Sequence, residues 1–196
     1  LSEIGRQLTV EGNFGGVQAL AITFVIIGFA FKVSAVPFHT WAPDTYEGAP
    51  TPVTAFLSVA SKAAGFVALV TLIYVGFPQA KDVWQPFIWV LAAATMTMGN
   101  LVALRQTNII RMLAYSSISQ GGFILMPLAV AGTGDAAGPA LQSVVVYLIV
   151  YAAMNLGMFA VVIAASRTTR SGEISSFGGL FSYAPGLGVL MTISNI

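Results

Sequence analysis

Apolar stretches long enough to cross a lipid bilayer follow one another along almost the whole of this 196-residue chain. A membrane-spanning helix needs about 20 mostly apolar residues. The composition agrees, because 57% of the residues are hydrophobic and 8% are charged, whereas a soluble domain carries roughly 25% charged residues. We therefore expect an all-α fold, a polytopic transmembrane helix bundle that lies in the lipid bilayer.

The connections between the expected helices carry the glycine, proline and charged residues. We expect one transmembrane domain over residues 1–196, with helices at 16–36 plus 38–46, 53–77, 83–104, 110–131, 140–165 and 185–196. The last helix is truncated and no initiator methionine is present, so the chain is expected to be an internal fragment of a longer polypeptide. Most arginines lie in connections on one side, which the positive-inside rule predicts to be cytoplasmic.

Two lysines, Lys32 and Lys62, lie inside apolar helices. An ammonium group is costly within a bilayer and persists mainly where it has a function. A lysine near a helix end often reaches the interface instead, but Lys62 follows Pro52 by ten residues, which is about 15 Å along a helix. Because a desolvated lysine loses its proton more readily than an arginine, the pair predicts proton handling.

A proline is predicted to break the first of these helices. One continuous helix from Gly16 to Tyr46 would be about 45 Å long, well over the roughly 30 Å hydrocarbon core. Pro37 cannot donate a hydrogen bond to the carbonyl of Val33, and it disfavours helical geometry in the residue before it. We expect a break just after Lys32, with the freed carbonyl forming a polar pocket beside that ammonium.

Other polar side chains recur at helical spacing on the expected helices. Such stripes either hold helices together by hydrogen bonds or line a path of water, and the pattern leaves both alternatives open. His39 is either a proton relay or a buried structural histidine, while Asp44 and Glu47 are expected to be solvated. The candidate path residues are Ser58, Ser61, Tyr115, Ser119, Gln120, Tyr147, Tyr151 and Asn155.

The composition excludes several other functions. The chain contains no cysteine and a single histidine, so no disulfide, iron–sulfur or soft-metal site is expected. No flavin-binding or nicotinamide-binding motif is present, and we expect no cofactor in this chain. A net charge of +1 gives no reason to expect a nucleic acid as a partner.

Two blocks of sequence resemble the antiporter-like membrane subunits of NADH-quinone oxidoreductase (respiratory complex I). They read FKVSAVPFHTWAPDTYEGAPTPVTAFLSVASK at Phe31–Lys62 and GNLVALRQTNIIRMLAYSSISQGG at Gly99–Gly122. The SVASK form at the second lysine favours the N subunit, also called subunit 2. The resemblance implies an antiporter-like fold of fourteen helices, of which this chain would cover about the seventh to the start of the twelfth.

The resemblance also implies roles for the two lysines. The lysine matching Lys32 pairs with a glutamate on an earlier helix, and the lysine matching Lys62 continues the proton path along the membrane midplane. That glutamate, and a third lysine on a later helix, are expected outside this chain. Gln120 stands where relatives often have histidine, so a titrating relay is not expected at that position.

The function implied is that of a proton-translocating subunit of NADH:quinone oxidoreductase in the bacterial inner membrane. Protons would move through Lys32 and Lys62, with His39 as a possible relay, coupled to NADH oxidation by quinone. Flavin and iron–sulfur clusters would belong to other subunits, and neighbouring antiporter-like subunits would be the partners. The alternatives are a subunit of a multisubunit cation/proton antiporter, or a structural spacer that moves no protons.

Overall fold

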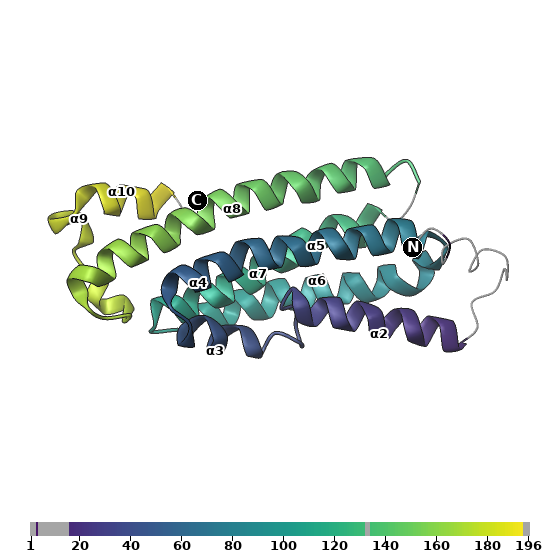
Figure 1. Cartoon of the computed structure of the whole chain (residues 1–196), viewed down its shortest axis with the longest axis horizontal. Helices are drawn as coiled ribbons and strands as arrows, with labels where there is room; N and C mark the ends of the chain where they lie inside the picture. The colour runs from purple at the N-terminus through teal and green to yellow at the C-terminus, as the bar shows by residue number, and fades with distance from the viewer. Residues whose placement is uncertain (1–2, 4–15, 132–133, 194–196) are drawn as a thin grey trace.

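The computed structural model describes residue 3, residues 16–131 and residues 134–193. In these ranges the chain forms helices that lie side by side with their long axes roughly aligned (Figure 1). Four of the described stretches are long and apolar enough to cross a membrane: Thr51–Gly76, Pro78–Ala103, Ile109–Ala131 and Ala137–Thr169. The expected all-α transmembrane bundle is confirmed.

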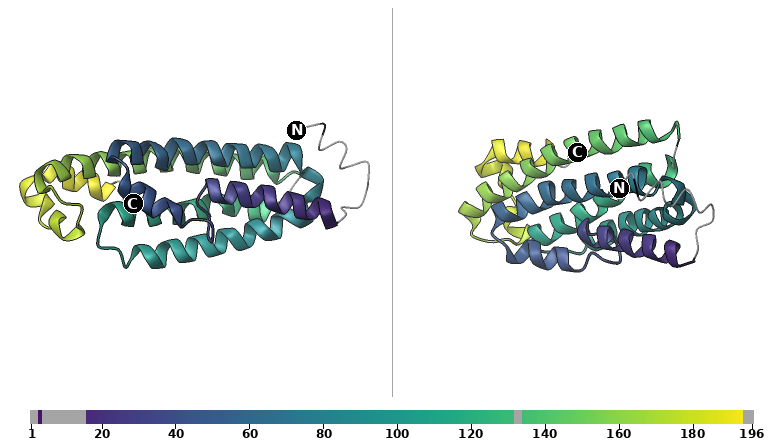
Figure 2. Two further views of the ribbon diagram at one scale, coloured as in Figure 1. Left: turned by 60° about the horizontal axis from the view of Figure 1, so that its bottom comes forward. Right: turned by 45° about the vertical axis from the view of Figure 1, so that its right-hand side comes forward.

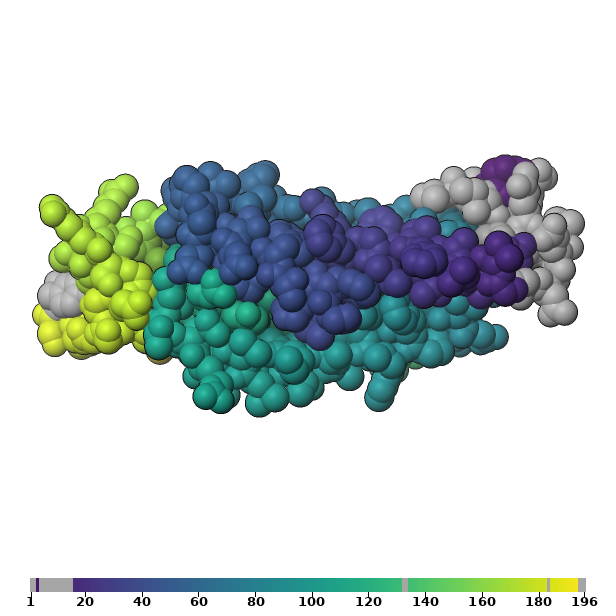
Figure 3. Space-filling model, turned by 90° about the horizontal axis from the view of Figure 1, so that it is seen from below, coloured from purple at the N-terminus to yellow at the C-terminus, as the bar shows by residue number. Residues whose placement is uncertain are grey.

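The first helix is broken. Helix α2 (Gly16–Lys32) has 17 residues, which is about 26 Å of helix and too short to cross the core alone. Helix α3 (Trp41–Gly48) continues along the same face of the molecule (Figure 3). Ile22, Ile26 and Ala30 lie on one side of α2 and are buried against the bundle, because residues four apart share a helix face.

The second piece begins at Trp41, later than the expected residue 38. Turns occupy the connection: the amide of Phe38 donates to Ala35, and the amide of Ala42 donates to the carbonyl of His39. Ser34 has a φ of 62°, and the Val36–Pro37 peptide bond is cis. The chain between α2 and α3 therefore runs through turns, and α3 begins only at Trp41.

The next span alternates α-helical and π-helical turns. Helix α4 begins at Thr51, with Pro52 in its first turn, where a missing amide proton is tolerated. The successive segments are α4 (Thr51–Phe56), a π-helical turn (Leu57–Ser61), α5 (Lys62–Thr71) and a second π-helical turn (Leu72–Gly76). The helix expected at 53–77 therefore has two local changes of period that the sequence pattern does not reveal.

Helices α6 (Lys81–Ala103) and α7 (Ile109–Ala131) form an antiparallel pair that packs along most of its length. The backbones approach closely at Gly99, where a Cβ would lie 2.7 Å from the backbone nitrogen of Ser119. The Oδ1 atom of Asn108 accepts hydrogen bonds from two amides in the first turn of α7. Such an Asn cap fixes where the helix begins.

Helix α8 (Ala137–Thr169) lies beside α4 and α7, as two further views show (Figure 2). It ends at Arg170, which has a φ of 51° and caps the helix in the left-handed conformation. A 3-10 turn (Ile174–Phe177) lies in what was expected to be a plain connection. Helices α9 (Leu180–Tyr183) and α10 (Pro185–Ile193) follow, and α10 packs on α8.

Three connections meet at one end of the bundle. The amide of Ile109 donates to the carbonyl of Gly172, and the amide of Ile174 donates to Thr107, each at 2.8 Å. The side chain of Asn108 also donates to Glu47, at 3.2 Å. The connections before α4, before α7 and after α8 therefore lie on the same side, as alternating spans require.

Candidate functional site

Lys62 is buried inside the bundle, with 3% of its surface exposed. It is the first residue of α5, directly after the π-helical turn. Its Nζ atom donates to the carbonyl oxygen and to the Oγ atom of Ser117 on α7, both at 2.7 Å. A buried ammonium is tolerated only where its protons find acceptors, and Ser117 supplies two of them.

Further polar groups surround this contact. The hydroxyl of Tyr151 lies 2.9 Å from Ser117 Oγ and 3.0 Å from the carbonyl of Ser58. The amide of Asn155 donates to Ser58 Oγ at 2.7 Å and to the Tyr151 hydroxyl at 3.1 Å. We call Ser58, Lys62, Ser117, Tyr151 and Asn155 the Lys62 cluster. All five side chains are buried, so the cluster is a hydrogen-bonded network enclosed in apolar surroundings.

Two features of the local backbone build this cluster. Ser58 lies on the π-helical turn, a wider turn that often occurs at functional sites, and both its hydroxyl and its carbonyl serve the network. Tyr151 and Asn155 are four residues apart on α8 and therefore share one face. Since a hydroxyl has a single proton, Tyr151 donates to only one of its two acceptors at a time.

The broken helix also reaches the cluster. Tyr46 on α3 is 2% exposed, and its side chain hydrogen-bonds to Ser117. The carbonyl of Tyr46 accepts a hydrogen bond from the Thr54 hydroxyl at 2.8 Å. Ser117 and Tyr46 were missed as candidates from the sequence. The four-residue spacing of Ser117 and Gly121, in a helix with a polar run, is a signal that could have indicated that face.

Lys32 lies in a different environment, on the exposed side of α2. Its Nζ atom donates to Ser61 Oγ at 3.0 Å. Within the described ranges, Lys32 makes no hydrogen bond to the freed Val33 carbonyl. That carbonyl instead lies beside α7, 3.6 Å from where a Cβ on Gly121 would be. The turn at Ser34 and Pro37 directs it toward the Lys62 side of the break.

The other candidates fall into separate groups. The half-buried His39 lies edge-on to Tyr115, with 6.3 Å between the ring centroids. Gln120 accepts a short hydrogen bond from Tyr147. Ser119 faces α6 at Gly99, and within the described ranges its hydroxyl has no hydrogen-bond partner. The predicted path residues therefore do not form one continuous chain, and only Ser58, Tyr151 and Asn155 join Lys62.

Charged side chains pair at the end of the bundle where the connections meet. Arg111 Nη1 lies 2.7 Å from Asp44 Oδ1 and 2.7 Å from Glu47 Oε2. The two carboxylates therefore bind a side chain of α7, and both are also exposed to solvent, as the sequence predicted. These ion pairs tie α3 to α7 and thus hold Tyr46 near Ser117.

We expect Arg111→Gln to destabilise the protein only slightly, by about 1 kcal/mol or less, because both partner carboxylates remain largely accessible to water. Thermal inactivation of the solubilised complex measures the effect. Arg105→Gln is the matched control, since Arg105 is an exposed arginine in the connection just before α7. Equal midpoints for the two variants would show that the ion pairs do not hold α3.

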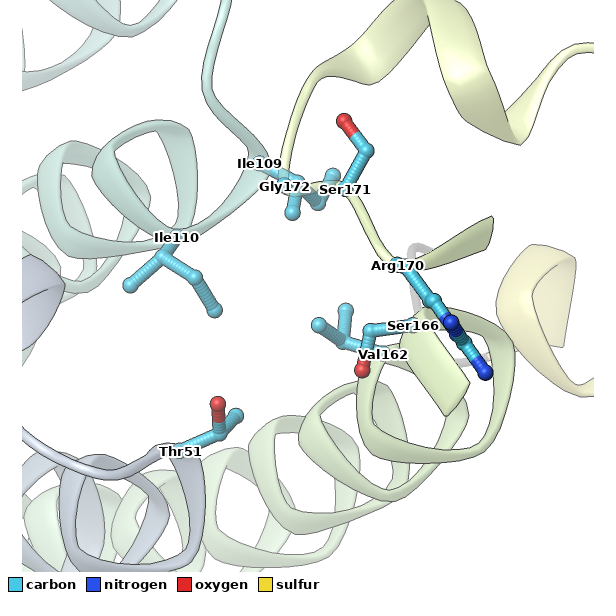
Figure 4. Close-up of a pocket in the computed structure, with 8 residues that line it drawn as sticks. All are labelled: Thr51, Ile109, Ile110, Val162, Ser166, Arg170, Ser171 and Gly172. Atoms are coloured by element: carbon cyan, nitrogen blue, oxygen red, sulfur yellow. The ribbon is translucent and has the colours of Figure 1, made fainter. Parts of the chain in front are cut away.

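A pocket of about 360 Å³ lies near the same end, among α4, α7 and the C-terminal end of α8. Thr51, Ile110 and Val162 face its opening, and Arg170 and Ser171 lie at its rim (Figure 4). It contains no member of the Lys62 cluster. In the part of the chain that the structure describes, no group of three or more His, Cys, Asp or Glu side chains is placed to hold a metal ion.

A lysine buried in a polar network beside a broken helix is a feature of a polytopic membrane protein, because an ionisable group inside a membrane span is costly and rare. The chain belongs to the NADH:quinone oxidoreductase/Mrp antiporter transmembrane family, which matches residues 3–196. NADH-quinone oxidoreductase subunit N of Heliobacterium modesticaldum is 50% identical over 177 residues, which are 90% of this chain and 36% of that protein.

Solved structures agree with this assignment. A chain of the membrane-bound sulfane sulfur reductase, an archaeal respiratory membrane complex, matches with a TM-score of 0.80 and 28% identity over 91% of this chain and 36% of that one. A chain of respiratory complex I from Thermus thermophilus matches with a TM-score of 0.68 and 30% identity over 93% of this chain and 38% of that one. The chain thus spans about a third of the length of the relatives that it matches.

Proposed function

We propose that this chain is part of a proton-translocating, antiporter-like subunit in the membrane arm of an NADH-quinone oxidoreductase. The observation that carries the proposal is the buried ammonium of Lys62, held by Ser117 within a network of hydroxyl and amide groups. Membership of the family and 50% identity to a subunit N support it. The protein would lie in a bacterial inner membrane beside other membrane subunits, while flavin and iron–sulfur clusters would belong to subunits outside the membrane arm.

Lys62 would be the central proton carrier. The network around it offers proton-exchanging groups on its α8 side, because hydroxyl groups both donate and accept hydrogen bonds. Tyr151 has two alternative acceptors, and by turning its O–H from the Ser58 carbonyl to Ser117 Oγ it would change the direction in which the Ser117 hydroxyl donates. Asn155 has no proton to give up and would hold the Ser58 and Tyr151 oxygens in place.

Lys32 would be the group that switches between charged and neutral states. Ser61, its hydrogen-bond partner, precedes Lys62 directly in the chain, so Lys32 lies close to the span that carries the central carrier. A carboxylate partner from another part of the subunit would favour the charged lysine when near and the neutral one when distant. His39 would act as a proton relay on the side of the bundle where the connections meet. Its ring contacts the ring of Tyr115.

The test is proton movement by the assembled complex in membrane vesicles, energised with NADH and a quinone. We expect Lys62→Ala and Lys32→Ala each to lower the protons moved per electron, because each removes a proton-binding group that no neighbouring side chain replaces. Lys81→Ala is the matched control, since Lys81 lies at the end of the bundle, in the first turn of α6.

Each outcome is decisive. Full proton movement by both variants, with assembly intact, would overturn the proposal in favour of a structural spacer. Proton movement that depends on sodium and proceeds without NADH would instead identify a cation/proton antiporter, the other branch of the family.

A further inference from the structure

The two sides of the helix break satisfy their backbone groups differently. The amide of Val36 donates to the Thr95 hydroxyl of α6 at 2.9 Å. The carbonyl of Val33 is buried with the rest of that residue, which is 1% exposed, and Pro37 has no proton to donate to it. No hydrogen bond within the described ranges reaches this oxygen. Buried carbonyls are almost always paired with protein or with ordered water.

Lys62 has a complementary unused group. An ammonium carries three protons, and two of them are directed to the carbonyl and hydroxyl of Ser117. No acceptor for the third is found in the part of the chain that the structure describes. A buried donor left without a partner is destabilising, so a partner for the third proton is expected nearby.

These two groups flank the same small space, which exists because residue 121 is glycine. A Cβ at Gly121 would lie 3.6 Å from the Val33 oxygen and 4.0 Å from Lys62 Nζ. The Cζ atom of Phe66 would be 3.7 Å away and forms an apolar wall. A position with a donor on one side and an acceptor on the other, bounded by apolar atoms, has the chemistry that holds a single buried water.

We propose that Gly121 maintains a water-binding site between Lys62 Nζ and the Val33 carbonyl. The water accepts the third proton of the ammonium and donates one of its own to the carbonyl. It thereby links the Lys62 cluster to the broken helix. Gly121 is a positioning residue, because it acts through the space that it leaves. The effect on proton movement that we expect rests on the proposed function. The presence of the water does not.

Replacing Gly121 with alanine tests the site with little strain, since all three contacts of the new methyl group would be ordinary van der Waals distances. We expect proton movement to fall by about tenfold or more, the effect of losing one hydrogen bond to a charged group, while assembly stays normal. Gly28→Ala is the matched control: Gly28 is also a helical glycine, and a Cβ there meets nothing within 4 Å.

Gly121→Ser separates loss of water from simple crowding. A serine hydroxyl placed in this space accepts from Lys62 and donates to Val33, so we expect proton movement to recover toward the parent value. If bulk alone mattered, serine would be at least as harmful as alanine. High-resolution structures of the assembled complex supply a second readout: density for a water beside Gly121 in the parent, and none in the alanine variant.

The outcomes also separate this inference from the proposed function. Normal transport in Gly121→Ala together with loss in Lys62→Ala would overturn the water site and leave the function standing. Normal transport in Lys62→Ala would overturn the function, and the water density would then decide the site alone. A serine variant no better than the alanine one, or a parent structure without density beside Gly121, would also contradict the inference.

Discussion

Replacing Lys62 with arginine is expected to stop proton movement by the assembled complex, lowering it by at least about tenfold, because an arginine side chain does not give up its proton in proteins. The positive charge is kept, and so is the ability to donate to Ser117. Only the release of a proton is lost. Lys62→Arg therefore tests whether Lys62 must lose its charge during turnover. Lys62→Ala alone does not test this, because it removes the charge and the side chain together.

Lys62→Met completes this comparison. Methionine has a similar length, adapts to irregular spaces and removes the charge, so it tests whether a permanently neutral side chain suffices. We expect both variants to assemble, as judged by native gel electrophoresis, and both to fail in proton movement. Lys81→Arg, at the end of the bundle, should behave as the parent. Transport by Lys62→Arg at the parent rate would show that Lys62 does not release a proton during turnover.

Gly99→Ala is expected to have the largest effect on stability among the substitutions considered for this chain. A Cβ at residue 99 would lie 2.7 Å from the backbone nitrogen and 2.8 Å from the Cα atom of Ser119, distances that require α6 and α7 to separate. Overpacking of this kind typically costs about 1–3 kcal/mol, against a gain of about 1 kcal/mol in helix propensity. We expect less assembled complex and a lower midpoint of thermal inactivation.

A second substitution, combined with Gly99→Ala, shows whether contacts with backbone atoms cause the loss of stability. Ser119→Gly removes the Cβ atom that would lie 2.9 Å from the new methyl group but leaves the backbone contacts in place. The double variant should therefore remain less stable than the parent. Gly28→Ala is again the control, because its Cβ would be unobstructed. An unchanged midpoint in Gly99→Ala would mean that the two helices adjust without loss.

Three glycines illustrate how little of the packing is visible in the sequence. Gly99, Gly121 and Gly122 all lie in a stretch that predicts transmembrane helices, and nothing in the pattern separates them. In the folded chain a Cβ would be blocked by backbone atoms at Gly99 and Gly122, but accommodated at Gly121. Small residues allow close approach of membrane helices, but which partner approaches depends on how each helix is rotated.

The sequence alone determined the membrane-spanning helices, the break after Lys32 and the presence of Lys62 within an apolar span. Each of these follows from a local cost in free energy. The costs are those of exposing polar backbone groups to lipid, placing a proline within a helix, and placing a charge within a bilayer. A chain of this composition has few other ways to fold, so the residue types and their spacing suffice.

Only the tertiary structure decided which groups meet Lys62. Ser117 and Tyr151 come from two other helices, and the π-helical turn at Ser58 has no signal in the pattern. The Val33 carbonyl, expected beside Lys32, lies near Gly121 instead. The physical reason is that both the lipid-facing and the protein-facing sides of these helices are apolar. Hydrophobic periodicity therefore does not fix their rotation, which is set by close packing and by the few hydrogen bonds that buried polar groups must make.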